Sequence, residues 1–183
     1  MFAMPDETPR IKPLPENEWD ETVAGVVSVT GPLNIFTTLG RHPDLFKSWI
    51  GFGTMLLLEG RLPARDRELA ILRAAHNNAC TYEWTHHVRL GHDAGLNDAE
   101  IAALAAGLDE HPWAPADRAV VAAADELHTT KTLSDASWAS LSERFDEPGL
   151  IELVILIGHY TMLAFALNAL NVQPENVQPE EEH

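Results

Sequence analysis

Apolar residues recur at helical spacing along most of this chain, and we find no convincing alternation of the kind that strands show. Residues 33–39 and 45–58 each carry apolar side chains at this spacing. Gly40 and Pro43 separate the two segments, and Gly60 ends the second. This pattern predicts an all-α protein.

The same signals predict helices through the rest of the chain. We expect them from residue 64 to the Asn77-Asn78 pair, then at 79–94, from Asn97 or Asp98 to Leu104, and at 115–128, 135–145 and 149–170. The last of these is apolar almost all round, which favours a buried position.

The two ends differ in composition from the middle. Prolines at 5, 9, 13 and 15 predict an extended arm at 1–15, placed to embrace a neighbouring subunit. A helical domain is expected at 16–173. Asn-Val-Gln-Pro-Glu at 171–175 is repeated at 176–180 and followed by Glu-Glu-His, which predicts a disordered acidic tail at 174–183.

Composition narrows the function classes. A chain of 183 residues, 45% of them hydrophobic, suits one domain or two small halves around a shared core. Its net charge of -16 repels phosphate backbones and anionic membranes, so we expect neither nucleic acid nor a membrane as partner. No signal peptide is evident, and no stretch is expected to approach the length of a membrane span. Together with the single cysteine, this favours a cytoplasmic protein.

One helical stripe gathers reactive side chains. Cys80, Glu83 and His87 follow one another at i, i+3 and i+7, so a thiol, a carboxylate and an imidazole share one face. Cys80 is the only cysteine, and an intramolecular disulfide is therefore excluded.

A short internal repeat suggests the architecture. The sequence Glu-Leu-Ala-Ile-Leu at 68–72 returns as Glu-Leu-Val-Ile-Leu at 152–156. Such a repeat is typical of a fold built from two similar helical halves that pack together. At this offset Ala164, Leu167 and Asn171 correspond to the three residues of the reactive stripe, so the second half keeps the scaffold without the chemistry.

The spacing of Glu68, Cys80, Glu83 and His87 resembles the motif of the carboxymuconolactone decarboxylase and AhpD-like superfamily. That motif reads Glu, eleven residues, Cys, two residues, Cys, three residues, His. The flanking phrases resemble the branch with a CxYEWxxH-type motif, and the resemblance covers roughly residues 30–173. It implies an AhpD-like helical bundle built from two similar halves, which assembles as a homo-oligomer.

The chain differs from the motif at the second cysteine position, on which the peroxidase reaction depends. In AhpD-like peroxidases two cysteines cycle between dithiol and disulfide, but the second cysteine position here is Glu83. The resemblance leaves Glu68 and His87 as a proton-transfer pair, Cys80 as a candidate thiol and Glu83 as a new carboxylate. The decarboxylase branch implies cofactor-free decarboxylation, isomerisation or lactone hydrolysis of a small carboxylated or lactone compound. Acid–base groups work best near neutral pKa, which a glutamate reaches only when buried.

Each candidate also has a structural interpretation. Glu68 could form an ion pair with a neighbouring arginine, and Glu83 could pair with Arg89. Cys80 could be a buried hydrophobe, or a thiol whose pKa the start of a helix lowers. His86 points about 100° away from His87, towards solvent.

The expected substrate pocket includes four further residues. They are Asn34, Tyr82, Trp84 and Tyr160. We expect His128, His159 and Asn168 to be polar groups satisfied within the core, and Trp49, Trp113 and Trp138 to pack.

A metal site would require His76, Glu83 and His87 on one continuous helix. The break at Asn77-Asn78 argues against that helix, so we expect no metal. No HExxH motif, CxxC pair or phosphate-binding glycine loop occurs, and no other cofactor is expected.

Three hypotheses follow. The first is a cofactor-free lyase, isomerase or hydrolase acting on a small-molecule substrate. The second is a thiol peroxidase in which Cys80 alone is oxidised to a sulfenic acid and reset by an external thiol. The third is a catalytically silent helical oligomer that binds a ligand or partner.

Overall fold

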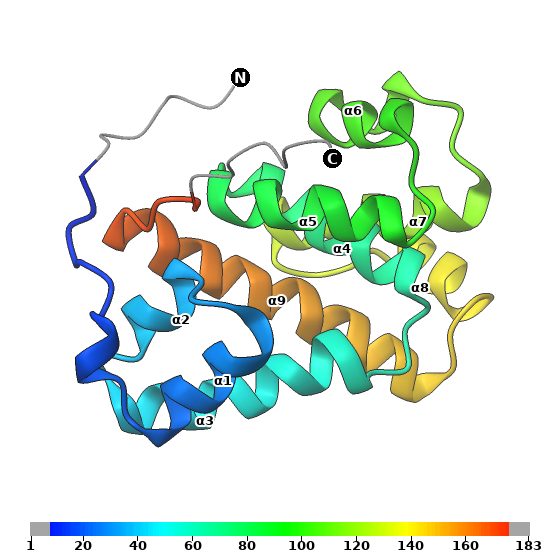
Figure 1. Ribbon diagram of the computed structural model, residues 1–183. Helices are drawn as coiled ribbons and strands as arrows, with labels where there is room; N and C mark the ends of the chain where they lie inside the picture. The colour runs from blue at the N-terminus through cyan, green and yellow to red at the C-terminus, as the bar shows by residue number, and fades with distance from the viewer. Residues whose placement is uncertain (1–7, 176–183) are drawn as a thin grey trace.

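The computed structural model describes residues 8–175, which contain helices and no strands (Figure 1). The α-helices are α1 Glu21–Thr30, α2 Asn34–Leu39, α3 Pro43–Thr54, α4 Ala64–Asn77, α5 Thr81–Asp93, α6 Asp98–Ala106, α7 Pro115–Thr130, α8 Asp135–Ser142 and α9 Glu147–Leu170. Shorter elements are the 3₁₀ turns η1 Glu16–Glu18 and η3 Leu108–Glu110, and the π-helical turn η2 Met55–Glu59 that continues α3. The all-α prediction is confirmed.

Side-chain caps define several of the helix starts. Asp20 and Asp146 each accept a hydrogen bond from a backbone N–H in the first turn of α1 and α9. At α6, Asn97 and Glu100 form a reciprocal capping box. Asn171 ends α9 in the left-handed conformation that asparagine tolerates, with φ of 54°.

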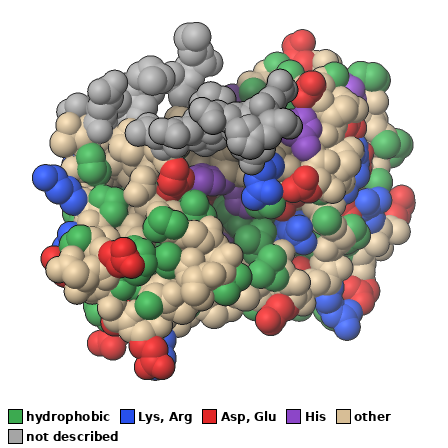
Figure 2. Space-filling view, viewed as in Figure 1, with side chains coloured by type: hydrophobic (Ala, Val, Ile, Leu, Met, Phe, Trp, Pro, Cys, Tyr) green, Lys and Arg blue, Asp and Glu red, His purple; other side chains and the backbone are tan. Residues whose placement is uncertain are grey.

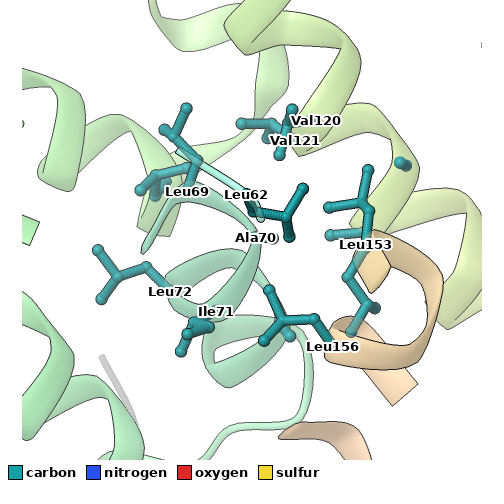
Figure 3. Close-up of a cluster of buried hydrophobic side chains, with 14 of the residues drawn as sticks. Leu62, Leu69, Ala70, Ile71, Leu72, Val120, Val121, Leu153 and Leu156 are labelled. Atoms are coloured by element: carbon teal, nitrogen blue, oxygen red, sulfur yellow. The ribbon is translucent and has the colours of Figure 1, made fainter. Parts of the chain in front are cut away.

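The main core lies where α4, α7 and α9 meet. Leu69, Leu72, Val120, Leu153 and Leu156 from these helices belong to one hydrophobic cluster and are almost completely buried (Figure 3). Burial of an aliphatic side chain contributes about 1.5–3 kcal/mol, so this cluster fixes α4 against its neighbours. Because α4 carries Glu68, the core also determines where that carboxylate lies.

A second, smaller cluster joins the beginning and the end of the chain. Ile35 of α2 packs with Cys80 and Tyr82 at the start of α5, and with Leu163 and Leu167 of α9. Helix α2 is therefore held against α5, which carries the reactive stripe, and against α9 (Figure 1).

Most predicted helices are confirmed, with shifted ends. Helix α5 begins at Thr81 rather than at 79, because Ala79 takes a left-handed φ of 50° and Cys80 is extended. Helix α1 was missed. Its sequence Glu-Thr-Val-Ala-Gly-Val-Val-Ser-Val-Thr is rich in β-branched residues, which have a low helix propensity, and the Asp20 cap overrides that preference.

Helix α9 is long and apolar enough to cross a membrane by length and composition, so the expectation that no segment approaches that length is wrong. Half of its apolar window is buried inside the fold, as in the central helix of a soluble protein. Ile151, Ile155, Met162 and Phe165 lie on the part of α9 that stays exposed.

Both ends of the described chain lie against its own helices. The Arg10 backbone N–H donates to the Leu170 carbonyl oxygen at 3.0 Å, and the Leu14 N–H donates to the Thr37 carbonyl oxygen at 2.9 Å. The rest of the predicted arm, residues 1–7, and most of the predicted tail, 176–183, lie outside the described residues.

Candidate active site

The turn between α4 and α5 brings two helical stripes together. The Cys80 N–H donates to the Ala75 carbonyl oxygen at 2.9 Å, which folds α5 back along α4. A Cβ on Gly91 would lie 3.1 Å from Cδ1 of Leu72, so the glycine permits a close approach of the two helices. One turn earlier on each helix, His87 and Glu68 come into contact.

Glu68 and His87 form a buried pair. Nδ1 of His87 lies 2.7 Å from Oε2 of Glu68, whose side chain has no exposure to solvent. The other carboxylate oxygen accepts a hydrogen bond from Nε of Arg67 at 3.1 Å. The ion pair considered from the sequence is thus present through Arg67, in addition to the contact with histidine. Since His87 lines a cavity, its Nε2 is the ring nitrogen available to a ligand.

Glu83 is a buried carboxyl group one turn from His87. It is 2% exposed, and no N–H or O–H group among residues 8–175 donates to either oxygen. Burial raises the pKa of Glu83 to about 8, and a smaller opposing effect comes from a hydrogen bond with the Cys80 thiol. Arg89, the partner considered from the sequence, instead lies 3.4 Å from Asp93. Glu83 therefore carries a proton at neutral pH.

Cys80 is completely buried at the N-cap of α5. Burial raises the pKa of its thiol well above the ordinary range, and the neighbouring Glu83 charge raises it further. The alternative in which the helix start lowers this pKa is wrong, because loss of hydration outweighs the nearby amides. Cys80 is a neutral thiol packed among Ile35, Leu163 and Ala164.

A cavity of about 480 Å³ opens beside these groups. Most of its wall is apolar and comes from α1, α2, α3, α5 and α9, with Tyr82, Glu83, His87 and Tyr160 among the lining residues. Figure 2 shows histidine and apolar side chains gathered around a hollow near the middle of one face. Pockets of this size and character suit small organic molecules.

Tyr160 and His159 form the α9 side of the cavity. The Tyr160 ring stands edge-on to His87, with ring centroids 5.0 Å apart. Burial raises the pKa of Tyr160, and the charges of Glu68 and Glu83 raise it further, so its hydroxyl stays protonated. The His159 ring stacks on Trp49 at 6.0 Å, and burial lowers its pKa, which favours the neutral ring. Trp49 thus lines the cavity in addition to packing.

A second polar group at the cavity was not predicted from the sequence. Tyr82 Oη donates to Oε1 of Glu175 at 2.8 Å, and His86 Nε2 lies 2.6 Å from Oε2 of the same carboxylate. The Asn34 backbone N–H donates to Glu175 as well, and the Asn34 side chain donates to the Gln173 carbonyl oxygen at 2.9 Å. The expectation that His86 faces solvent is wrong, since its ring is partly buried and lines the cavity.

The remaining candidates lie elsewhere. Trp84 does not line the cavity, because it projects from α5 one position beyond Glu83 and meets His76 with ring centroids 6.1 Å apart. Asn34 lies behind the lining, in contact with the C-terminal segment. Within residues 8–175 no three His, Cys, Asp or Glu side chains gather as metal ligands, so His76, Glu83 and His87 do not form that set.

Residues 43–126 match the model of the carboxymuconolactone decarboxylase family. The matched segment includes Glu68, Cys80, Glu83 and His87. A comparison with curated proteins finds no significant match.

Solved structures share the fold. An alkylhydroperoxidase AhpD core protein from Ralstonia eutropha, described as an uncharacterized peroxidase-related protein, superposes with a TM-score of 0.80 and 19% identity over 95% of each chain. An uncharacterized peroxidase-related protein from a Silicibacter species superposes with a TM-score of 0.75 and 14% identity, over 96% of this chain and 92% of that one. A third structure is the debrominase Bmp8, a cysteine-to-alanine variant in complex with 2,3,4-tribromopyrrole. It superposes with a TM-score of 0.76 and 19% identity, over 93% of this chain and 94% of that one.

Proposed function

Because the chain belongs to the carboxymuconolactone decarboxylase and AhpD-like superfamily, we propose that it is an enzyme that transfers protons to and from a small organic substrate without a cofactor. The observation that carries this proposal is Glu83, a buried acid with a pKa of about 8 beside the Glu68–His87 pair. One group that holds a proton and one that can accept it meet at the same cavity.

His87 acts as the general base. Glu68 accepts a hydrogen bond from Nδ1–H, which leaves the lone pair on Nε2 toward the cavity. When Nε2 takes a proton from the substrate, the imidazolium that forms is stabilised by the carboxylate behind it. Arg67 orients that carboxylate by donating a hydrogen bond from Nε to its other oxygen.

Glu83 acts as the general acid. Proton removal from a carbon next to a carbonyl, or loss of carbon dioxide from a carboxylated carbon, leaves an electron pair on that carbon. Glu83 donates its proton to this pair, and the resulting carboxylate is then reprotonated from His87 or water. The net reaction is an isomerisation or a decarboxylation, with no electrons gained or lost overall.

The environment of Cys80 makes the one-cysteine peroxidase the weaker alternative. Peroxide reacts with a thiolate, whereas Cys80 is fully buried and its pKa is raised. The debrominase Bmp8 binds a small halogenated ring in a similar fold, which supports a small organic occupant but not a particular reaction for this chain.

Deuterium exchange tests the proposal without knowledge of the physiological substrate. The enzyme is incubated in D₂O with a panel of small β-keto acids, 2-oxo acids and lactones, and carbon-bound deuterium and released carbon dioxide are followed by NMR. We expect enzyme-dependent exchange or decarboxylation of at least one member, and a loss of about 10²–10⁴-fold in His87→Gln and Glu83→Gln.

Two controls sharpen this experiment. Cys80→Ser should retain the exchange, while a loss in that variant accompanied by peroxide consumption in the wild type would favour the peroxidase. No exchange with any compound, at an enzyme concentration that detects a rate far below ordinary turnover, would count against proton-transfer catalysis and favour the silent oligomer.

A further inference from the structure

Glu175 places a carboxylate among several donors at the edge of the cavity. Oε1 accepts hydrogen bonds from Tyr82 Oη at 2.8 Å and from the Asn34 backbone N–H, and Oε2 lies 2.6 Å from His86 Nε2. Burial raises the pKa of Glu175, but these hydrogen bonds outweigh that effect and hold it at about 2. The group is therefore an anion that accepts two hydrogen bonds and lies in close contact with His86.

Two of these donors share helix α5 and the cavity wall with the proposed catalytic groups. Tyr82 and His86 stand at i and i+4 on α5, and Glu83 and His87 stand one position further at the same spacing. All four residues line the cavity, whereas Glu175 approaches from outside the lining. An anion bound to Tyr82 and His86 would thus lie next to the buried acid and base.

We propose that the Asn34 N–H, Tyr82 Oη and His86 Nε2 form the carboxylate-binding subsite of the substrate pocket, and that Glu175 occupies it in the absence of substrate. The inference rests on the proposed function and specifies its substrate class. The substrate is a small monocarboxylate with an apolar body, since the carboxylate replaces that of Glu175 and the remainder fills the apolar cavity.

The substrate can displace Glu175 because one carboxylate replaces another. A substrate carboxylate accepts the same hydrogen bonds, so the groups that now contact the Glu175 carboxylate keep a partner when it leaves. Glu175 itself is only partly buried, with a quarter of its side chain exposed. A neutral amide of the same shape offers only one acceptor oxygen, and its NH2 group cannot replace the oxygen that lies next to His86 Nε2.

Benzoate binding tests the subsite directly. Isothermal titration calorimetry with the full-length protein compares benzoate with the neutral isostere benzamide. In the wild type Glu175 competes with benzoate. We expect Glu175→Gln to bind benzoate about tenfold or more tightly than the wild type, because the subsite is then free more of the time. Glu143→Gln removes one exposed negative charge from α8's C-terminal side and should leave the affinity unchanged.

A second substitution tests the donors. In the Glu175→Gln background, Tyr82→Phe should weaken benzoate binding about tenfold and benzamide binding less, because a hydrogen bond to a charged oxygen is stronger than one to a neutral amide oxygen. Circular dichroism and thermal unfolding verify that each variant is folded. Because residues 176–180 repeat the sequence of the docked segment, the variant E175Q/E180Q is included and should bind benzoate at least as tightly as E175Q.

The outcomes separate this inference from the proposed function. Equal binding of benzoate and benzamide, or no effect of Glu175→Gln and Tyr82→Phe, would overturn the subsite even if the enzyme exchanged carbon-bound protons. Conversely, selective benzoate binding that His87→Gln leaves intact would support the subsite even if no compound in the exchange panel reacted.

Discussion

Nδ1 of His87 lies 2.7 Å from Oε2 of Glu68, and the carboxylate is fully shielded from solvent. This contact fixes the ring orientation and makes Nε2 the nitrogen that meets the cavity. It also links two helices of the core, because Glu68 belongs to α4 and His87 to α5.

Glu68→Gln should keep the fold and lose activity. A glutamine can still contact Nδ1, but it lacks the charge that stabilises the imidazolium, so we expect exchange activity to fall about 10²–10⁴-fold. The measurement is the deuterium incorporation described above. Activity within about twofold of the wild type would assign Glu68 to the ion pair with Arg67 alone.

Glu83 makes the stability of the protein depend on pH. Its folded pKa of about 8 exceeds the ordinary glutamate value of 4.5, so between these values the folded state retains a proton that the unfolded state releases. The contribution of Glu83 to the free energy of unfolding is therefore largest below about pH 4.5. This contribution declines as the pH rises towards 8. The full change in the free energy of unfolding is on the order of 5 kcal/mol.

Urea unfolding of the wild type and Glu83→Gln measures that dependence. The variant lacks the titrating group, so its advantage over the wild type should grow from pH 5.5 to 8 and then level off. Glu143→Gln is the matched control on the surface. Parallel curves for the wild type and Glu83→Gln would show that Glu83 titrates at an ordinary pKa.

Cys80 should react slowly in the native protein. Because the thiol is buried and its pKa is raised, its labelling by a disulfide reagent at pH 7 should be at least about 100-fold slower than that of a free cysteine. Unfolding in urea should restore the ordinary rate. Rapid native labelling, or rapid sulfenic acid formation with peroxide, would instead support the peroxidase hypothesis.

Two positions on α9 test the core. Leu153 is fully buried, and Leu153→Ala should lower the free energy of unfolding by about 2–5 kcal/mol because a cavity remains. Ile151 is 65% exposed, and Ile151→Ala should change the free energy of unfolding by less than about 0.5 kcal/mol. Similar losses at both positions in urea unfolding would mean that the outer face of α9 is covered in solution.

The sequence predicted the helical class and most helices because their periodicity and caps are local signals. The reactive stripe was equally local, since the spacing of Cys80, Glu83 and His87 determines their common face. Contacts between distant segments could not be predicted in this way. Tyr82 donates a hydrogen bond to Glu175, which lies 93 positions later in the chain, whereas the sequence around Glu175 suggested only a solvated acidic tail.

The surroundings of single side chains were also beyond the sequence. For Cys80 the sequence left two alternatives, a buried hydrophobe and an activated thiol, and the packing from α2 and α9 that buries it favours the first. His86 was assigned to solvent from its angle on α5, although α1 and α2 lie close enough to enclose a cavity around it. Trp84 belonged to the motif, yet its angle on the same helix directs it away from that cavity.

The position of α9 at the end of the chain has a consequence for biosynthesis. Glu68, Glu83 and His87 have all left the ribosome long before Tyr160 and Leu163, which form the opposite wall of the cavity, have been added. A nascent chain therefore carries its acid and base before it has a compartment that excludes water around them. For the activity proposed above, a product that ends before α9 would keep the acid and the base but lack this wall of the cavity, so we expect it to be inactive.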